Sequence, residues 1–526
     1  MTLLDRTLKF FGLARRQARR QIVRTYQAAL PSRQTADWPM VQTSANADIR
    51  RALRNLRARS RELQRNNALI KKFISMIGNN VAGPEGMTLS DVLQPEDGQE
   101  LDAEFNDAVI KAFNEWARPE NASSSGKLSW ADQQKLIMET VARDGEVLIR
   151  KRIGDNPFAF CLQFVDVSWL DETFNTILEN GNRVLMSVEL NPLDRPVAYW
   201  LTRPASDYLY PEYGEPIFRQ RVPAEEIYHW FITTEHETQV RGVPWAHAVM
   251  EMLHTINGYV DAELYAARAG ACVTDYLIPP KETEVKAPDE TNALPPDPRI
   301  SQSFQPGAVR ELETAVMQIT PPGYEVKSND PKHPNTNFES FLKGSERFVA
   351  TGLDVPYFRL ASDLNGVNYT SSRAGDNEAR DLYRWLQRWL RDKARMVFFD
   401  VARRSMLTGA MPISILDFDR LDPTFHPRGW DSVDEQKDAT ADDMRISACT
   451  DTLTRVCADR GLDFRKIVKK RAEEIALLKK YGVEAFALKP RVPSSPIQEE
   501  PASDQPPDAP PPGEPPPKSN GDAHVL

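Results

Sequence analysis

The chain has 526 residues, of which 41% are hydrophobic, so it is long and apolar enough for two to four domain-sized units with real cores. Its formal net charge of −9 argues against a protein that grips a phosphate backbone over its whole surface, although local basic stripes remain compatible with it. No run of eighteen apolar residues occurs and the N-terminus lacks a secretory signal pattern, so we expect no membrane association and a protein made or assembled inside a cell.

The four cysteines are expected to be reduced and structural, because they show neither CxxC spacing nor the density of a disulfide scaffold. They are Cys161, Cys272, Cys449 and Cys457.

The N-terminal region is basic and helical. Residues 1–42 form an amphipathic arm, for which docking on another subunit is favoured over a membrane-surface or nucleic-acid role. Residues Asp48–Ile77 are predicted to form one helix, ended by Gly78, with an apolar face and an arginine face. Three roles remain open for that arginine face: a solvated surface, a subunit interface or a DNA contact. Its members are Arg50, Arg51, Arg54, Arg57, Arg61 and Arg65.

An α+β domain follows. Two helices are predicted at residues 105–116 and 130–143. Strand-like runs come next, and the turn-rich pieces between them, such as Asn180–Asn182, are typical of an antiparallel meander. The predicted strands are 146–152, 158–165, 184–190, 197–202 and 226–231.

A long amphipathic stretch at 242–278 follows the last predicted strand. Apolar residues recur every three or four positions and predict a helix from Pro244 to Arg268, with small side chains along its C-terminal half. Such small residues allow a neighbouring helix to approach closely. The residues expected to pack this helix are Trp245, Val249, Met252, Ala262, Ala266 and Gly270.

The second half of the chain contains an insertion, a return helix and a further helical region. Residues 281–334 are proline-rich and predict a small β-rich module, and Phe338–Leu353 predicts a helix that brings the chain back. A polar loop at Ser362–Arg373 separates this helix from a long one at 374–407. Arginines repeat on one face of the long helix, where a solvated face, an intersubunit seam and nucleic-acid contact all remain open. They are Arg380, Arg384, Arg388, Arg391 and Arg395.

The C-terminal part is predicted to be helical over 432–486, with Asp463 capping one helix. From Pro490 onward, proline, serine and acidic residues predict a disordered or polyproline-like tail.

Motifs for catalysis are weak. Residues Asn121–Leu128 (NASSSGKL) miss two positions of a phosphate loop, since Asn121 replaces a glycine and Leu128 a hydroxyl. The histidines and acids near His229 and His236, and the pair His247 and His254, lack metal-site spacing. We therefore expect neither an enzyme nor a cofactor. One alternative left open is a metal-dependent nuclease.

Six blocks of sequence carry a resemblance to a known family and occur in that family's order. They are Ser60–Asn67 (SRELQRNN), Arg221–His229 (RVPAEEIYH), Gln239–Trp245 (QVRGVPW), Asp261–Arg268 (DAELYAAR), Pro356–Tyr357 and Asn368–Ala374 (NYTSSRA). From about Thr43 to Phe486 the chain resembles the lambda-type phage portal protein family. The N-terminal arm matches only loosely, and the proline-rich tail is not covered. The alternative kept open beside this family is another phage head structural or adaptor protein.

The resemblance implies a ring of subunits, usually twelve, at one capsid vertex, through which DNA is packaged and later ejected. It implies a portal fold with an α+β wing, a two-helix stem, a small β-rich clip and a helical crown. The implied parts are the arm 1–42, wing 43–241, stem helix 242–278, clip 279–335, stem return helix 336–358, channel loop 359–374, second wing part 375–427, crown 428–489 and tail 490–526.

The resemblance also implies site residues and partners. The channel loop would present Leu364, Asn365, Gly366, Val367, Asn368 and Tyr369. Contacts to DNA or to a neighbouring subunit would come from Arg373, Arg380, Arg384 and Arg388. The implied partners are double-stranded DNA, the terminase large subunit, the head–tail connector, and the major capsid and scaffold proteins. The implied locations are the portal vertex of the virion and, during assembly, the host cytoplasm.

Overall fold

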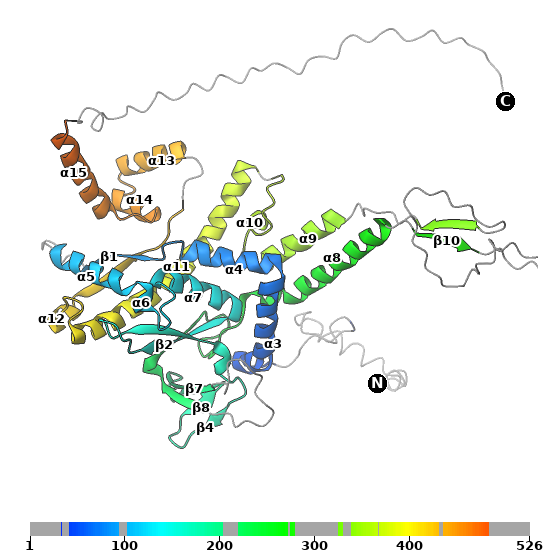
Figure 1. Cartoon of the computed structure of the whole chain (residues 1–526), viewed down its shortest axis with the longest axis horizontal. Helices are drawn as coiled ribbons and strands as arrows, with labels where there is room; N and C mark the ends of the chain where they lie inside the picture. Colours follow the sequence, from blue (N-terminus) through cyan, green and yellow to red (C-terminus); the bar gives the residue numbers. More distant parts are fainter. Residues whose placement is uncertain are drawn as a thin grey trace, which may run out of the picture. The chain divides into compact units, whose positions relative to one another are not determined.

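The structure is a computed structural model in which the chain divides into two units, residues 1–430 and 431–526 (Figure 1). The first unit mixes helices with small antiparallel sheets, which confirms the predicted α+β class. The described residues are 33, 42–93, 103–202, 219–271, 274–278, 325–329, 338–366, 368–430 and 435–482. Most of the N-terminal arm and the whole proline-rich tail lie outside them.

The first described helices are α3 (Ala45–Asn66) and α4 (Ala68–Val81), so the single helix predicted over Asp48–Ile77 is wrong. Asn67 separates them because its backbone is extended and its side-chain oxygen accepts a hydrogen bond from the Ile70 amide at 3.1 Å. An asparagine in this position ends one helix and caps the next. Its side-chain amide nitrogen also donates to the Asn257 side-chain oxygen at 3.0 Å, so the break between α3 and α4 contacts the predicted stem helix.

The main core lies among α5 (Ala103–Trp116), α7 (Trp130–Asp144) and α11 (Tyr369–Thr408). The Phe113 ring lies 5.3 Å from Trp116, 5.4 Å from Phe398 and 6.0 Å from Phe425. Aromatic packing therefore joins segments about 300 residues apart into one core. Short helices complete this part of the chain: α6 (Pro119–Ala122), α10 (Tyr357–Leu360) and α12 (Ile415–Phe418).

Two sheets carry the predicted strands. One has the order β3–β2–β9 and the other the order β4–β5–β6–β7–β8, all antiparallel, and the second is the predicted meander. The strands are β2 (Glu146–Arg152), β3 (Cys161–Val165), β4 (Thr176–Ile177), β5 (Arg183–Leu185), β6 (Val188–Leu190), β7 (Pro196–Thr202), β8 (Arg219–Pro223) and β9 (Ile227–Phe231). Short 3₁₀ turns occur at Val167–Trp169 and Ala224–Glu226.

The strand predicted over residues 184–190 is two strands, β5 and β6. Met186 and Ser187 separate them, and both have positive φ angles of 49° and 68°. Two successive residues of this kind form the tight turn that joins twisted antiparallel strands. One further sheet, β1 (Thr88–Leu93) paired with β12 (Leu421–His426), has no counterpart in the sequence prediction.

The predicted stem is a helix pair with revised bounds (Figure 1). A 3₁₀ turn at Trp245–Ala248 precedes α8 (Met250–Ala271), and the return helix α9 covers Phe338–Gly352. The stem helix does not extend over 242–278: residues Thr274–Ile278 form β10, paired with β11 (Glu325–Asn329). The sequence TDYLI is rich in β-branched and aromatic residues, which favour a strand once a partner strand is present. Apart from β11, the predicted β-rich module at 281–334 lies outside the described residues.

The second unit is helical, as predicted. It contains α13 (Glu435–Ser447), α14 (Leu453–Asp459) and α15 (Phe464–Lys480). Asp463 caps α15 by accepting hydrogen bonds from the amides of Arg465 and Lys466, which confirms the predicted cap. In the described part of this unit no side chain is buried, and the exposed fractions reach 66% for Met444, 57% for Leu477 and 69% for Tyr481.

Candidate functional site

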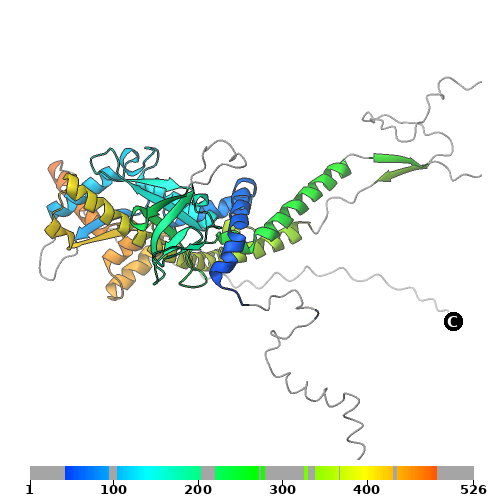
Figure 2. The same ribbon diagram turned by 90° about the horizontal axis from the view of Figure 1, so that it is seen from below.

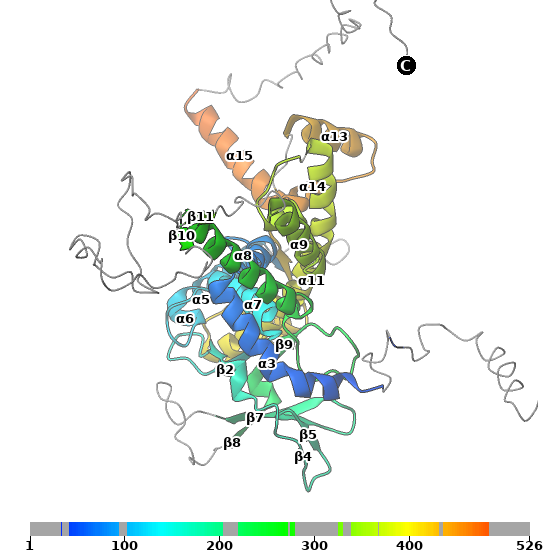
Figure 3. The same ribbon diagram turned by 90° about the vertical axis from the view of Figure 1, so that its right-hand side faces the viewer.

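The two stem helices lie side by side and run in opposite directions (Figures 2 and 3). Tyr259 on α8 packs against Phe338 and Phe341 on α9, with ring centroids 5.8 and 5.0 Å apart. At the opposite end of the pair, a Cβ added at Gly352 would overlap the Val249 side chain. The close helix approach therefore falls at Val249 and Gly352, because only glycine leaves room there.

The predicted stem-packing residues divide into two groups. Val249 is buried, and Trp245 and Met252 are half-buried against the main core. Ala262 is exposed and Ala266 is half-buried. For Gly270 the structure describes only its place in α8. The first group thus packs within the chain, and the role of the small residues in packing against a neighbour stays a prediction.

Large apolar side chains lie exposed along the stem. The exposed fractions are 53% for Leu264, 69% for Tyr265, 54% for Phe341 and 62% for Phe348. Leu264 and Tyr265 lie on α8, and Phe341 and Phe348 lie on α9. Exposed large apolar side chains on neighbouring helices are typical of a surface covered by another protein.

The predicted channel loop is shorter than its predicted span of 359–374. Residues 357–360 form α10, and α11 begins at Tyr369, five residues before its predicted start. Asn368 causes the early start, since its side chain accepts a hydrogen bond from the Ser371 amide at 2.8 Å in a capping box. The loop therefore covers residues 361–368.

The loop residues differ in exposure. Leu364 is 70% exposed, Asn365, Gly366 and Asn368 are exposed, and Gly366 has a φ of 73° with open space around it. Val367 and the side chain of Tyr369 lie outside the described residues. The described tip is polar or small apart from Leu364, and it carries no charged side chain between Asp363 and Asn368.

One carboxylate connects this loop to the stem. Asp363 accepts hydrogen bonds from the Asn365 amide at 3.0 Å and from the Tyr357 hydroxyl at 3.2 Å, and it lies 3.4 Å from the Lys343 ammonium of α9. The Asn365 amide and the cation hold the pKa of Asp363 below its ordinary value, although partial desolvation opposes them. In contrast, burial raises the pKa of nearby Glu346.

The predicted arginine stripe on α11 is partly occupied within the chain. Arg380 and Arg384 lie over the Trp430 ring at 5.7 and 6.0 Å, and Arg384 also pairs with Asp381 at 3.3 Å. Arg388 and Arg373 are exposed, and Arg373 makes an interaction within the chain. Trp385, on the same exposed face, is 48% exposed. An exposed tryptophan among arginines has the composition of a protein contact surface.

The arginine face predicted on the first helix is partly buried, which corrects that prediction. The Arg57 guanidinium is 5% exposed and donates to Glu146 at 2.7 Å. Arg61 donates to Asp144 at 2.8 Å and to Asp166 at 2.8 Å. Burial opposes ionisation of Asp166, but the Arg61 hydrogen bonds outweigh it and lower the Asp166 pKa to about 2. These two arginines therefore fix α3 to the rest of the unit rather than facing a partner.

Glu146 is the centre of a buried ion cluster that sequence inspection missed. Its carboxylate is fully buried and accepts hydrogen bonds from Arg241 at 2.6 and 2.9 Å and from the Gly242 amide at 3.0 Å. His229 lies 2.8 Å away, and Arg57 completes the set. Burial alone would raise the Glu146 pKa, but Arg241, His229 and Arg57 hold it well below its ordinary value.

Arg241 also binds the sheet that carries the meander. Its guanidinium donates to the carbonyl oxygens of Met186 at 3.0 Å and Leu170 at 3.2 Å. Directly after it, Gly242 packs backbone to backbone against Gly145, where an added Cβ would overlap the Gly145 carbonyl. The QVRGVPW block thus joins α3, both sheets and the start of the stem. His229, weighed as a metal ligand from sequence, belongs to this cluster.

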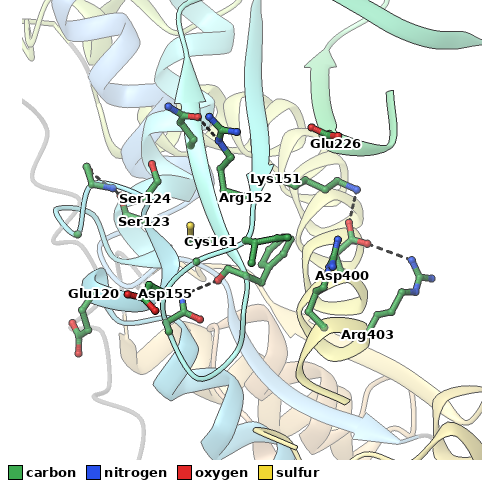
Figure 4. A pocket seen from close by; sticks show the side chains of 18 of the residues that line it. Glu120, Ser123, Ser124, Lys151, Arg152, Asp155, Cys161, Glu226, Asp400 and Arg403 are labelled. Carbon is green, nitrogen blue, oxygen red and sulfur yellow. Dashed lines mark hydrogen bonds and ion pairs between the residues drawn. The ribbon is translucent and has the colours of Figure 1, made fainter. Parts of the chain in front are cut away.

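A cleft of about 1570 Å³ lies between the β2–β3 hairpin and the C-terminal half of α11 (Figure 4). Lys151 is 2.6 Å from Asp400, which also accepts from Tyr228 and pairs with Arg403 at 3.5 Å. Charges of both signs line the cleft. Residues of the incomplete phosphate loop also line it, but the amides of Ser124 and Gly126 donate to backbone carbonyls, so they form no phosphate cradle.

Within the described ranges, no group of three histidine, cysteine or acidic side chains is arranged to hold a metal ion. Nor does that part of the chain contain a helix with the length and apolar character needed to cross a membrane.

The chain is similar to known proteins in sequence. Residues 31–387 match the model of the family described as phage portal protein, lambda family. The chain is 33% identical over 470 residues to a probable portal protein of Halomonas phage phiHAP-1, covering 88% of each chain.

Solved structures also match. One is a chain from the neck of a native gene transfer agent particle computed with C12 symmetry, at 12% identity and a TM-score of 0.43, covering 77% of this chain and 93% of that one. Another is an HK97-family phage portal protein from Corynebacterium diphtheriae, at 11% identity and a TM-score of 0.27, covering 60% and 82%. On the strength of the family model and the sequence relative, the chain belongs to the lambda family of phage portal proteins.

Proposed function

We propose that the chain assembles into a closed ring of about twelve copies at one capsid vertex and acts as a conduit for double-stranded DNA. The observation that carries this proposal is the stem: α8 and α9 form a helix pair around an insertion, with Leu264, Tyr265, Phe341 and Phe348 exposed. In a ring, the stem of the next copy would cover these side chains. The family is structural, and we propose no catalytic activity and no cofactor.

The loop at 361–368 is proposed to face the channel. Its described tip presents Asn365 and Gly366, which offer amides and a bare backbone instead of fixed cations. A cationic ring would hold phosphates and slow the passage of DNA, because phosphate contacts dominate nucleic-acid affinity. The net charge of −9 supports the same conclusion.

Arg380, Arg384 and Arg388 of α11 are proposed to contact a neighbouring subunit rather than DNA. Arg380 and Arg384 already lie over Trp430, and Trp385 is exposed between Arg384 and Arg388. Tryptophan and arginine together are enriched at the centres of protein interfaces. Arg373, close to the loop, is the member of the set that we assign to DNA.

The proposed partners follow the family role. The insertion at the end of the stem would contact the terminase large subunit and, after packaging, the head–tail connector. The wing and crown would contact the major capsid and scaffold proteins. The proposed location is the portal vertex of the virion, reached after assembly in the host cytoplasm.

Electron microscopy of the purified chain, with mass measured by light scattering, tests the ring. We expect rings with a central hole and a mass near twelve chains. Where the free protein is monomeric, co-expression with the phage scaffold protein is the second measurement, because some rings need a nucleus. A compact dimer under both conditions would refute the proposal, and DNA cleavage by that dimer with divalent metal would favour a nuclease.

Substitution in the loop tests the channel assignment separately. Asn365→Lys places a cation on each exposed tip and should leave ring formation intact while changing DNA packaging or retention. Asn368→Lys is a poorer choice, because Asn368 also caps α11. Gln436→Lys, at an exposed position of helix α13, is the matched control because it adds the same single charge. Packaging by Asn365→Lys at the level of the control would remove the loop from the channel.

A further inference from the structure

The junction between the stem and the loop is built from four polar side chains. Lys343 and Glu346 lie on α9, Tyr357 begins α10, and Asp363 is the third residue of the loop. Asp363 meets both Lys343, at 3.4 Å, and the Tyr357 hydroxyl, at 3.2 Å. Through its other oxygen it accepts from the Asn365 amide at 3.0 Å, so the same carboxylate also shapes the exposed tip.

Lys343 and Tyr357, the two donors from the stem side, each have a second acceptor within reach. The Lys343 ammonium lies 2.8 Å from Glu339, one turn earlier on α9, and the Tyr357 hydroxyl lies 3.4 Å from a Glu346 oxygen. If Asp363 moves away, Lys343 keeps Glu339 and Tyr357 turns to Glu346. No donor is left buried without an acceptor, which is the usual reason that breaking a polar contact is unfavourable.

The surroundings leave room for such a movement. A cavity of about 480 Å³ lies beside these residues, between α4, α9 and α10, and is lined in part by Leu69, Leu342 and Leu360. Ser362 has a φ of 55° and Gly366 a φ of 73°, so two backbone positions flank Asp363 in the left-handed region. By contrast the base of the loop is fixed, since Arg359 on α10 binds Asp376 on α11 with two hydrogen bonds of 2.8 and 2.6 Å.

We propose that Lys343 and Tyr357 are positioning residues that hold the loop against the stem through Asp363, and that this contact is a two-position latch between α9 and the loop. In the engaged position Asp363 binds both the Lys343 ammonium and the Tyr357 hydroxyl. In the released position Glu339 binds Lys343 and Glu346 binds Tyr357. A displacement of α9 therefore changes the position of the loop tip. The proposal rests on the proposed function only for the assignment of the tip to the DNA channel.

Hydrogen–deuterium exchange of the full chain, read on the peptide that spans the loop, tests the latch without DNA. Lys343→Met should speed exchange of the Asn365 amide region by about two- to fivefold, the range of a partly exposed ion pair. Glu339→Gln should slow it, because the competing acceptor for Lys343 is lost. Lys343→Arg should restore the original rate, and about 1 M salt should remove the difference between Lys343→Met and the unaltered chain.

The opposite changes expected in the exchange rates of Lys343→Met and Glu339→Gln distinguish a latch from a general loss of stability. Both Lys343→Met and Glu339→Gln remove the same i,i+4 pair within α9, so equal acceleration by the two would mean that the helix is merely weakened and would overturn the proposal. So would an unchanged rate in Lys343→Met. DNA retention by Asn365→Lys is measured independently: exchange that follows the prediction with normal retention leaves the latch standing and removes the loop from the channel.

Discussion

The strongest stability prediction concerns Arg241, whose guanidinium is fully buried between Glu146 and two backbone carbonyls. Arg241→Met keeps much of the aliphatic volume but removes the charge. Loss of one partner from a buried ion pair costs about 3–5 kcal/mol of unfolding free energy. The freed carbonyl oxygens of Leu170 and Met186 would add to this cost unless water reaches them.

The donors that remain on Glu146 keep the expected loss of unfolding free energy near the lower end of that range. Glu146 would retain Arg57, His229 and the Gly242 amide, so its carboxylate would not be left without donors. Arg241→Lys should fall between the native chain and Arg241→Met, because an ammonium supplies charge but cannot reproduce the contacts of a planar guanidinium.

Urea unfolding followed by tryptophan fluorescence measures the effect, since Trp116 and Trp230 are buried in the same unit. One protein concentration must be used throughout, because ring formation would raise the apparent stability. The control is Arg51→Met, which removes an exposed pair with Asp48 and should cost less than about 0.5 kcal/mol. Equal unfolding midpoints for Arg241→Met and Arg51→Met would refute the inference that buried charge pairing holds this unit together.

Three further predictions follow from particular contacts. Gly242→Ala should reduce folding yield sharply in expression and urea assays, because the added Cβ would overlap the Gly145 carbonyl. Gly258→Ala, in open space on α8, should instead raise the unfolding free energy by up to about 1 kcal/mol. Unfolding free energy should fall as pH falls from about 4 to 2, because Asp166 and Glu189 have folded pKa values of about 2 and the unfolded chain takes up their protons first. Arg221→Met, which frees Glu189, should make that loss shallower in acid titrations. Ala266→Trp should block rings in electron micrographs if the small face of α8 meets a neighbour; normal rings would show that it does not.

Local sequence signals predicted most helices and strands well. The capping aspartate of α15 and the strands β2 and β7 fall where the sequence pattern and turn residues predict them. The break at Asn67 was missed because the apolar pattern continues through it. An asparagine followed by a fresh apolar stripe is a cap signal, and it could have divided the helix.

Long-range pairing was the part that the sequence could not supply. β1 and β12 are separated by more than 300 residues, and nothing in either segment identifies its partner. The buried ion cluster was missed for a related reason, since arginines on a helix look solvated until their acceptors are known. One clue was present: Arg57 occupies the same stripe as the buried residues Leu53 and Ser60, at helical spacing.

The two kinds of ionic contact in this chain have different consequences for function. Around Glu146 the charges are buried, and loss of Arg241 would free the carbonyl oxygens of Leu170 and Met186, so this cluster resists change and fixes α3, the sheets and the stem entry as one body. Around Asp363 the charges are partly exposed, and each donor has a second acceptor nearby. In the proposed ring, a rigid unit with an adjustable contact at the stem would keep its shape while the loop at 361–368 changes position.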